Sequence, residues 1–335
     1  ENKVKMYFLN DLNFSRRDAG FKARKDALDI ASDYENISVV NIPLWGGVVQ
    51  RIISSVKLST FLCGLENKDV LIFNFPMAKP FWHILSFFHR LLKFRIVPLI
   101  HDIDELRGGG GSDSVRLATC DMVISHNPQM TKYLSKYMSQ DKIKDIKIFD
   151  YLVSSDVEHR DVTDKQRGVI YAGNLSRHKC SFIYTEGCDF TLFGVNYENK
   201  DNPKYLGSFD AQSPEKINLP GMQFGLIWDG DSVETCSGAF GDYLKFNNPH
   251  KTSLYLSMEL PVFIWDKAAL ADFIVDNRIG YAVGSIKEMQ EIVDSMTIET
   301  YKQISENTKI ISQKIRTGSY FRDVLEEVID DLKTR

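Results

Sequence analysis

The sequence of 335 residues lacks four features that would each indicate a particular class of protein. Its five cysteines are odd in number and form no C-x-x-C pair, which argues against a disulfide framework or a zinc site and favours a reducing cytoplasm. No apolar run approaches the roughly 20 residues that cross a bilayer. The net charge is only −4, and no known nucleic-acid-binding motif is present, so we expect no nucleic-acid partner. The first residues, ENKVKMYFLN, run into a predicted strand without a charged and then apolar leader, which also predicts a cytoplasmic chain.

Short β-branched or aromatic runs alternate with helix-length segments along the whole chain. In the first half the runs are VKMYFLN, ISVVNIP, DVLIFNFP, FRIVPLI, DMVISHN and IKIFDYL, and in the second half they are GVIYAG, DFTLFGV, PKYLGSF, FGLIWDG, LPVFIW and IGYAVG. This alternation is typical of parallel sheets with crossover helices. We therefore predict an α/β protein with two Rossmann-like domains that face each other across a cleft.

The domain boundaries follow from changes in composition. We expect an N-terminal domain over residues 1–155 and a C-terminal domain over residues 166–312. The polar segment SSDVEHRDVTDKQRG, residues 154–168, has the charge of a linker. The last segment, residues 313–335, contains YFRDVLEEVIDDLKTR, which predicts a helix with one apolar face that packs back on the N-terminal domain.

Four motifs in order along the chain resemble those of the GT-B sugar-nucleotide glycosyltransferases. They are LIHDIDELR, YAGNLSRHK, FGLIWDG and NNPHKTSLYLSMELPVFIW. More narrowly, the chain resembles the bacterial group that holds the adhesin glucosyltransferases and the O-antigen β-1,6-galactofuranosyltransferases. The resemblance implies a UDP-sugar donor bound mainly by the C-terminal domain, and a glycoside or lipid-linked acceptor bound by the N-terminal domain.

The reaction that this resemblance implies is transfer of a hexosyl group, galactofuranosyl in particular, during lipopolysaccharide O-antigen synthesis. The alternatives are a UDP-glucose-dependent glucosyltransferase, a non-catalytic GT-B partner protein and a UDP-sugar epimerase. Phe246 and Leu254 stand where the retaining GT-B pattern has two glutamates, so we expect an inverting enzyme. A homo-oligomer is possible.

The donor residues are predicted at strand ends and helix starts of the second half. In GVIYAGNLSRHK, Gly173 and Asn174 end a strand, and Arg177 and Lys179 lie at a possible helix start, where free N–H groups attract an anion. The alternative is a solvated basic turn. Lys251 falls in the first turn of the next helix, an unfavourable place for a cation unless an anion binds there. The resembled family has a phosphate-binding lysine at this position, and we place Asp229 with the donor residues.

The acceptor residues are predicted around PLIHDIDELRGGGGSDS. A transferase needs a carboxylate or an imidazole to take the proton from the acceptor hydroxyl. Asp102 is the first candidate base, followed by Asp104, His101 and Asp11. The alternative makes His101 a core histidine and Asp104 a helix cap. The four glycines suit a lid or acceptor loop, with Ser112 as a possible N-cap.

A metal is not expected. Two D-x-D patterns occur, Asp102 with Asp104 and Asp229 with Asp231, and such pairs hold a divalent cation in the other major glycosyltransferase fold. Because Arg and Lys can supply the positive charge instead, we predict neither a required metal nor another cofactor.

A membrane partner is expected from the charge distribution. Between residues 36 and 100, seven basic residues accompany only two acidic ones, Glu66 and Asp69. The segment KPFWHILSFFHRLLKFR predicts a helix with one apolar face, a basic face that includes Arg90 and Lys93, and Trp82 and Phe87 at the flanks. An ordinary crossover helix would explain the apolar face but not the excess of basic residues. The charge suits an anionic membrane surface, so we expect a peripheral protein on the inner face of the cytoplasmic membrane.

Overall fold

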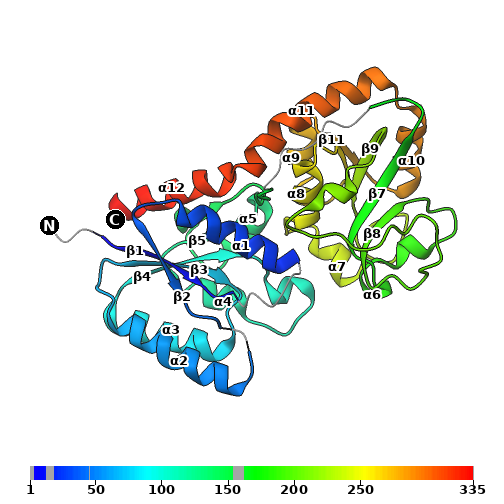
Figure 1. Cartoon of the computed structure of the whole chain (residues 1–335). Coiled ribbons are helices and arrows are strands. Elements are labelled where there is room, and N and C mark those ends of the chain that lie inside the picture. The colour runs from blue at the N-terminus through cyan, green and yellow to red at the C-terminus, as the bar shows by residue number, and fades with distance from the viewer. Residues whose placement is uncertain (1–3, 13–18, 45, 154–161, 335) are drawn as a thin grey trace. The chain divides into compact units, whose positions relative to one another are not determined.

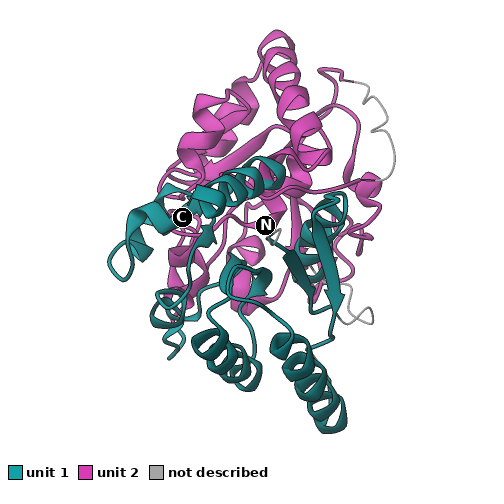
Figure 2. Cartoon of the chain, turned by 90° about the vertical axis from the view of Figure 1, so that its left-hand side faces the viewer, with its two compact units in different colours: residues 1–105, 109–146, 321–335 teal, residues 106–108, 147–320 magenta. Residues whose placement is uncertain are grey.

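The computed structural model describes residues 4–12, 19–44, 46–153 and 162–334. The chain divides into two compact units, coloured separately in Figure 2. Unit 1 comprises residues 1–105, 109–146 and 321–335, and unit 2 comprises residues 106–108 and 147–320. Residues 154–161 of the expected linker lie outside the described part, and its last two residues already belong to a strand.

Unit 1 contains a six-stranded parallel sheet in the order β2-β1-β3-β4-β5-β6. Its strands are β1 (Met6–Asn10), β2 (Ile37–Asn41), β3 (Val70–Phe75), β4 (Arg95–Ile100), β5 (Val123–Ser125) and β6 (Ile143–Asp145). The helices are α1 (Ala19–Ser32), α2 (Val48–Cys63), α3 (Lys79–Leu92), α4 (Asp113–Leu117), α5 (Pro128–Leu134) and most of α12 (Ser319–Thr334), with the 3-10 turns η1 (Asp104–Arg107) and η2 (Gln140–Lys142). Figure 1 shows α2 and α3 on one face of the sheet and α1 and α12 on the other.

Helices on both faces explain why the strands of unit 1 read as continuous apolar runs rather than alternating ones. Every residue of β3 is buried. Trp82 also belongs to this core and not to the exposed flank of α3 that the sequence predicts. Its ring centroid lies 5.9 Å from that of Phe75 and 6.3 Å from that of Phe73, because the sheet reaches beneath the first turn of the helix.

Unit 2 contains a five-stranded parallel sheet in the order β11-β10-β9-β7-β8. Its strands are β7 (Arg167–Asn174), β8 (Thr191–Val195), β9 (Met222–Ile227), β10 (Val262–Trp265) and β11 (Gly280–Val283). Its helices are α6 (Arg177–Cys180), α7 (Gly238–Tyr243), α8 (His250–Ser257), α9 (Ala271–Asp276), α10 (Ile286–Ser295) and α11 (Ile298–Arg316), with the 3-10 turns η3 (Ser181–Tyr184) and η4 (Pro214–Ile217). In the described part of the chain, no helix is long and apolar enough to cross a membrane.

The C-terminal helix α12 packs on unit 1, although α11 before it belongs to unit 2. The two helices are separated at Gly318, whose φ of 75° lies in the left-handed region that glycine adopts readily. In α12, Leu325 and Val328 are fully buried. Arg322 forms an ion pair with Asp33 at the end of α1 (2.5 Å).

Two predicted strands are wrong. Residues 146–152 follow β6 without continuing the sheet, because Lys147 takes a left-handed φ of 66° that ends the extended run. Residues 203–209 form only a single bridge, from Tyr205 to Leu192 of β8, and the chain then turns at Gly207 with φ 79°. In each case one backbone conformation interrupts an apolar sequence.

Candidate functional site

The order of strands in unit 2 reverses between β7 and β9, since β8 lies on one side of β7 and β9 on the other. β7 pairs with β9 only up to Ile170, whereas it pairs with β8 up to Asn174. Past Ile170, the backbone N–H of Ala172 donates instead to the hydroxyl of Tyr255 in α8 (2.7 Å). The carboxyl ends of β7 and β9 therefore diverge at the position where open α/β sheets bind their ligands.

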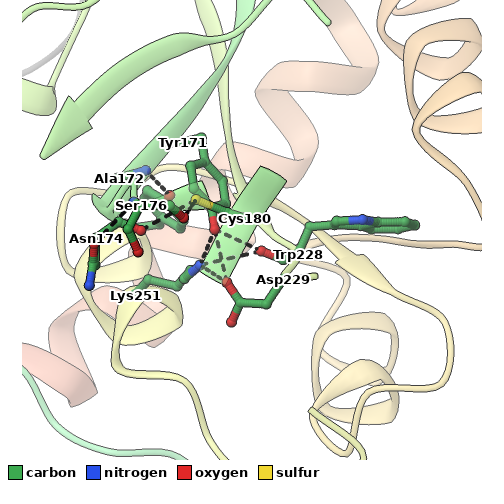
Figure 3. Close-up of polar contacts among 9 residues, drawn as sticks. Tyr171, Ala172, Asn174, Ser176, Cys180, Trp228, Asp229 and Lys251 are labelled. Carbon is green, nitrogen blue, oxygen red and sulfur yellow. Dashed lines mark hydrogen bonds and ion pairs between the residues drawn. The ribbon is translucent and has the colours of Figure 1, made fainter. Parts of the chain in front are cut away.

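Lys251 is the centre of a buried polar cluster at this position (Figure 3). It lies in the first turn of α8, as the sequence predicts. Its Nζ donates to Oδ1 of Asp229 (2.8 Å) and to the hydroxyl of Tyr171 (3.0 Å), and it lies 4.3 Å from the centroid of the Tyr171 ring. The side chains of Lys251 and Asp229 are only 9% and 7% exposed. The structure thus brings together two predicted donor residues and adds Tyr171.

The charges of this cluster are adjusted by burial and by one another. Burial lowers the pKa of Lys251, and the Asp229 carboxylate counteracts that effect. Burial raises the pKa of Asp229, but the charges of Lys251 and Lys179, with hydrogen bonds from Lys251 and Tyr171, outweigh it and lower that pKa overall. Asp229 is therefore ionised at neutral pH. Burial also raises the pKa of Tyr171, which keeps its hydroxyl protonated to donate to Asp229 (2.8 Å).

Lys179 lies beside this cluster. Its carbonyl accepts from the N–H of Gly230 (2.9 Å), directly after Asp229, and its Nζ lies 5.8 Å from the centroid of the Phe240 ring. Since its positive charge contributes to the lowered pKa of Asp229, the Lys179 side chain belongs electrostatically to the same site. It is half-buried, and so it keeps a path to solvent.

Arg177 is directed elsewhere. Its guanidinium pairs with Glu198 (2.5 Å) and lies 4.0 Å from the centroid of the Tyr184 ring, and it is exposed. Asn174 accepts from the N–H of Ser176 (3.1 Å) and from the side chain of Asn196. The helix expected here is the four-residue α6, followed at once by η3, so it offers little of the helix dipole on which the prediction relied.

Gly173 is required by the backbone at the end of β7. Its φ is 134°, a conformation that other residues rarely adopt. Opposite it in the sheet, Gly194 of β8 has no room for a side chain, because an added Cβ would lie 1.8 Å from the Gly173 carbonyl oxygen. The paired glycines let two backbones approach closely where the strand ends. The donor role of Gly173 stays a prediction.

A second polar chain links three strand ends of unit 1, where the strand order reverses between β1 and β3. Arg24 of α1 pairs with Asp11 after β1 (2.5 Å), and the amide of Asn74 in β3 donates to the other Asp11 oxygen (3.0 Å). Nε2 of His101, after β4, lies 2.8 Å from Oδ1 of Asn74. Because a carboxylate only accepts, Asn74 directs its NH₂ at Asp11 and its oxygen at His101. His101 then carries its proton on Nε2.

The other predicted acceptor residues lie close by in the sequence. Asp102 follows His101 and is half-buried, and Asp104 is exposed at the start of η1. Asp11 is almost fully buried, with both oxygens already in hydrogen bonds. This engagement argues for a supporting role of Asp11 rather than for the base itself.

Hydrogen bonds join the residues just before the glycine-rich loop to those just after it. Glu105 before the loop accepts from the N–H groups of Asp113 (2.8 Å) and Ser114 (3.0 Å) at the start of α4. Asp113 in turn accepts from the N–H of Asp104 (2.9 Å). Ser112 stands at the N-cap position, as expected, but makes no side-chain cap bond, and the carboxylate of Glu105 accepts from the first N–H groups of the helix instead.

Three important residues escape the sequence analysis: Tyr171, Asn74 and Tyr255. Each carries a polar group inside an otherwise apolar run, and a buried hydroxyl or amide needs a hydrogen-bond partner. A polar residue within an apolar run can therefore be recognised in the sequence, but its hydrogen-bond partner cannot. Among the described residues, no group of three or more His, Cys, Asp and Glu side chains is placed to hold a metal ion.

Comparison with known proteins places the chain in a family. Models of the N-terminal and C-terminal domains of glucosyltransferase 3-like proteins match residues 6–148 and 169–328. Glucosyltransferase 3 of Streptococcus gordonii and that of Streptococcus parasanguinis are each 22% identical to the chain, over 82% of it and 83% of the relative.

Solved structures agree on the fold. An α,α-trehalose-phosphate synthase (UDP-forming) from Burkholderia vietnamiensis is 9% identical, with a TM-score of 0.55 and 99% of both chains covered. A trehalose-6-phosphate structure from E. coli, bound with UDP-2-fluoro glucose, is 10% identical, with a TM-score of 0.53 and the same coverage. The prediction of two Rossmann-like domains of the GT-B class is confirmed. The chain belongs to the glucosyltransferase 3-like family, and it is a glycosyltransferase.

Proposed function

We propose that the protein transfers a hexosyl group from a UDP-sugar to a hydroxyl of a glycoside or lipid-linked acceptor. The observation that carries the proposal is the Lys251 cluster at the strand-order reversal of unit 2, where a buried cation lies in the first turn of a helix. A diphosphate needs such a charge, because negative charge accumulates on UDP as the bond to the sugar breaks.

In this proposal each residue of the cluster has a distinct task. Lys251 supplies positive charge to the diphosphate, and half-buried Lys179 adds to it. Asp229 and Tyr171 hold Lys251 in place before the donor arrives, since both accept hydrogen bonds from its Nζ. A cation positioned in advance does not have to reorganise as charge develops, which is the condition for strong electrostatic stabilisation.

On the acceptor side, we propose His101 as the base, with Asp102 next. The chain from Arg24 through Asp11 and Asn74 fixes the proton of His101 on Nε2. The Nδ1 lone pair is then the basic position of the ring, and a neutral imidazole suits proton transfer near neutral pH. Asp11 and Asn74 act through His101 as positioning residues.

Two observations favour different donor sugars. The two streptococcal relatives are named glucosyltransferases, which favours glucose. The sequence motifs resemble those of O-antigen galactofuranosyltransferases, which favours galactofuranose and a role in lipopolysaccharide synthesis. We also propose inversion at the anomeric carbon, because Phe246 and Leu254 cannot supply the carboxylates of the retaining pattern.

The test is incubation of the full chain with UDP-glucose or UDP-galactofuranose and a panel of alkyl glucosides, followed by mass and anomeric analysis of the products. We expect one donor to give an acceptor-dependent hexoside with inverted configuration. Without acceptor, slow release of UDP is expected, which a non-catalytic binding protein would not show. Absence of both transfer and hydrolysis with every UDP-sugar would contradict the proposal.

A further inference from the structure

Helix α2 of unit 1 turns apolar side chains toward solvent. Val48 is 74% exposed and Val56 is 63% exposed, and Val49, Ile52 and Ile53 are exposed between them. These positions share one side of the helix, because successive residues are rotated by about 100°. The buried side of α2 holds Ser54, Leu58 and Leu62. The exposed side is thus at least as apolar as the side that packs on the sheet.

Helix α3 extends this apolar area. It packs beside α2 on the same face of the sheet (Figure 1), and its Phe87 and Leu91 are 61% and 63% exposed. Single exposed apolar residues are ordinary, but seven on two neighbouring helices indicate an interaction surface. We call the exposed sides of α2 and α3 the outer face, defined by Val48, Val49, Ile52, Ile53, Val56, Phe87 and Leu91.

Basic residues border the outer face. By helical position, Lys57 lies at one edge of the apolar stripe of α2. Arg51 lies in the first turn of α2, on the side of Leu58 and Leu62, and both basic residues are exposed. On α3, His83 and Arg90 are exposed beside Phe87 and Leu91. The sequences of α2 and α3 contain no acidic residue. The outer face therefore combines an apolar centre with a margin of only positive charge.

This combination distinguishes between the possible occupants. A second copy of the chain, docked through the same face, would bring basic margins together without an acidic partner on either helix. An anionic bilayer offers both complements at once, acyl chains for the valines and isoleucines and phosphate headgroups for Arg51, Lys57 and Arg90. All seven apolar side chains of the outer face are exposed, so the face is available to a bilayer.

We propose that α2 and α3 form a docking surface for an anionic lipid bilayer. The surface is separate from the polar cluster at the strand ends and does not depend on the proposed reaction. The structure also shifts the expected membrane contact from α3 toward α2. The sequence directs attention to α3 alone, whereas five of the seven exposed apolar residues come from α2.

The experiment is co-sedimentation of the full chain with vesicles of phosphatidylcholine alone and with vesicles that also contain phosphatidylglycerol. We expect several-fold more protein to pellet with the anionic vesicles, and less as salt is added. Two variants divide the surface into its parts: Lys57→Glu/Arg90→Glu reverses two charges, and Ile52→Ser/Val56→Ser removes apolar area. Each should weaken binding at least tenfold.

The matched control is Lys287→Glu/Lys302→Glu, which makes the same change in net charge at two exposed positions of unit 2. It should bind as the unchanged protein does, and urea unfolding should show that all variants fold. The proposal is overturned if the unchanged protein does not pellet with anionic vesicles, or if the control loses as much binding as the α2 and α3 variants. It is also overturned if Ile52→Ser/Val56→Ser dissociates a dimer while vesicle binding persists.

Discussion

Lys251 occupies a position that is electrostatically unfavourable unless other groups compensate it. The N-terminal end of a helix carries partial positive charge, and burial further disfavours an ammonium group. Asp229 and the face of the Tyr171 ring offset both effects. Removing one partner of a buried ion pair costs about 3–5 kcal/mol, so Asp229 and Lys251 must be changed together for a clean comparison. In the proposed reaction, the positive charge of Lys251 serves the diphosphate of the donor.

The acceptor residues give a prediction about turnover. We expect His101→Asn to lower the rate of transfer by roughly 10²- to 10⁴-fold, the usual contribution of a general base. UDP affinity should be nearly unchanged, because His101 belongs to unit 1 and the Lys251 cluster to unit 2. Asn74→Ala should lower the rate of transfer less than His101→Asn does, because it removes the hydrogen bond that orients the His101 ring but keeps the ring itself. Initial rates and UDP calorimetry on the same preparations separate the two effects.

Asp102→Asn is the comparison that decides between the two bases. If it causes the large loss of turnover while His101→Asn keeps near-normal turnover, Asp102 is the base and the assignment of His101 is wrong.

At the scale of elements, apolar periodicity in the sequence predicts most strands and helices correctly. The prediction fails where the backbone conformation of a single residue ends an element. Ten strands and the helices α3 and α12 follow from periodicity, because tertiary packing and local pattern agree there. The two missing strands end at Lys147 and Gly207, whose left-handed φ no pattern reveals. In the candidate site, Lys251 and Asp229 were predictable from strand ends and a helix start. The contacts of Tyr171 and Asn74 were not, since hydrogen bonds between distant segments leave no periodic signal.

The exposed side of α2 illustrates the same limit. The run VVQRIISSV places its apolar residues on one side of a helix, a pattern that by itself suggests that this side is buried. Only the packing of Leu58 and Leu62 on unit 1 shows which side remains outside.

The end of β5 gives a prediction about pH. His126 is buried there, 2.9 Å from the carbonyl of Ile100, and burial lowers its pKa from 6.5 to about 4. Between these values the unfolded chain binds a proton that the folded chain does not. Stability should therefore fall as the pH is lowered from about 6.5 to about 4, by on the order of 3 kcal/mol in total. Urea unfolding across this range measures it.

His126→Gln should flatten this pH dependence, because it removes the titrating ring while keeping an amide donor. The control, His178→Gln, changes an exposed histidine of unit 2 and should leave the slope in place. An unchanged slope in His126→Gln would show that other groups cause the loss of stability.

At the scale of the whole molecule, the two units share one design. Each has a parallel sheet whose strand order reverses, and each has a buried polar network at that reversal, around Lys251 in unit 2 and around Asn74 in unit 1. The carboxylates of the second D-x-D pair have other partners, since Asp229 pairs with Lys251 and Asp231 accepts from the Ser237 hydroxyl.

This arrangement predicts that transfer does not need a divalent metal, because in the proposed reaction lysines supply the positive charge for the diphosphate. Activity should survive treatment with EDTA. A loss of activity that magnesium or manganese restores would show that a D-x-D pair holds a metal after all.

The most direct measurement of the central claim is calorimetric titration of UDP into the full chain and two variants. We expect the unchanged protein to bind UDP and Lys251→Met to bind it at least tenfold more weakly, because a charge-assisted hydrogen bond contributes about 1.5–3 kcal/mol. Lys251→Met/Asp229→Asn, which leaves no unpaired buried charge, should recover stability in urea yet still bind UDP weakly. Binding of UDP by this double variant as tightly as by the unchanged protein would contradict the account.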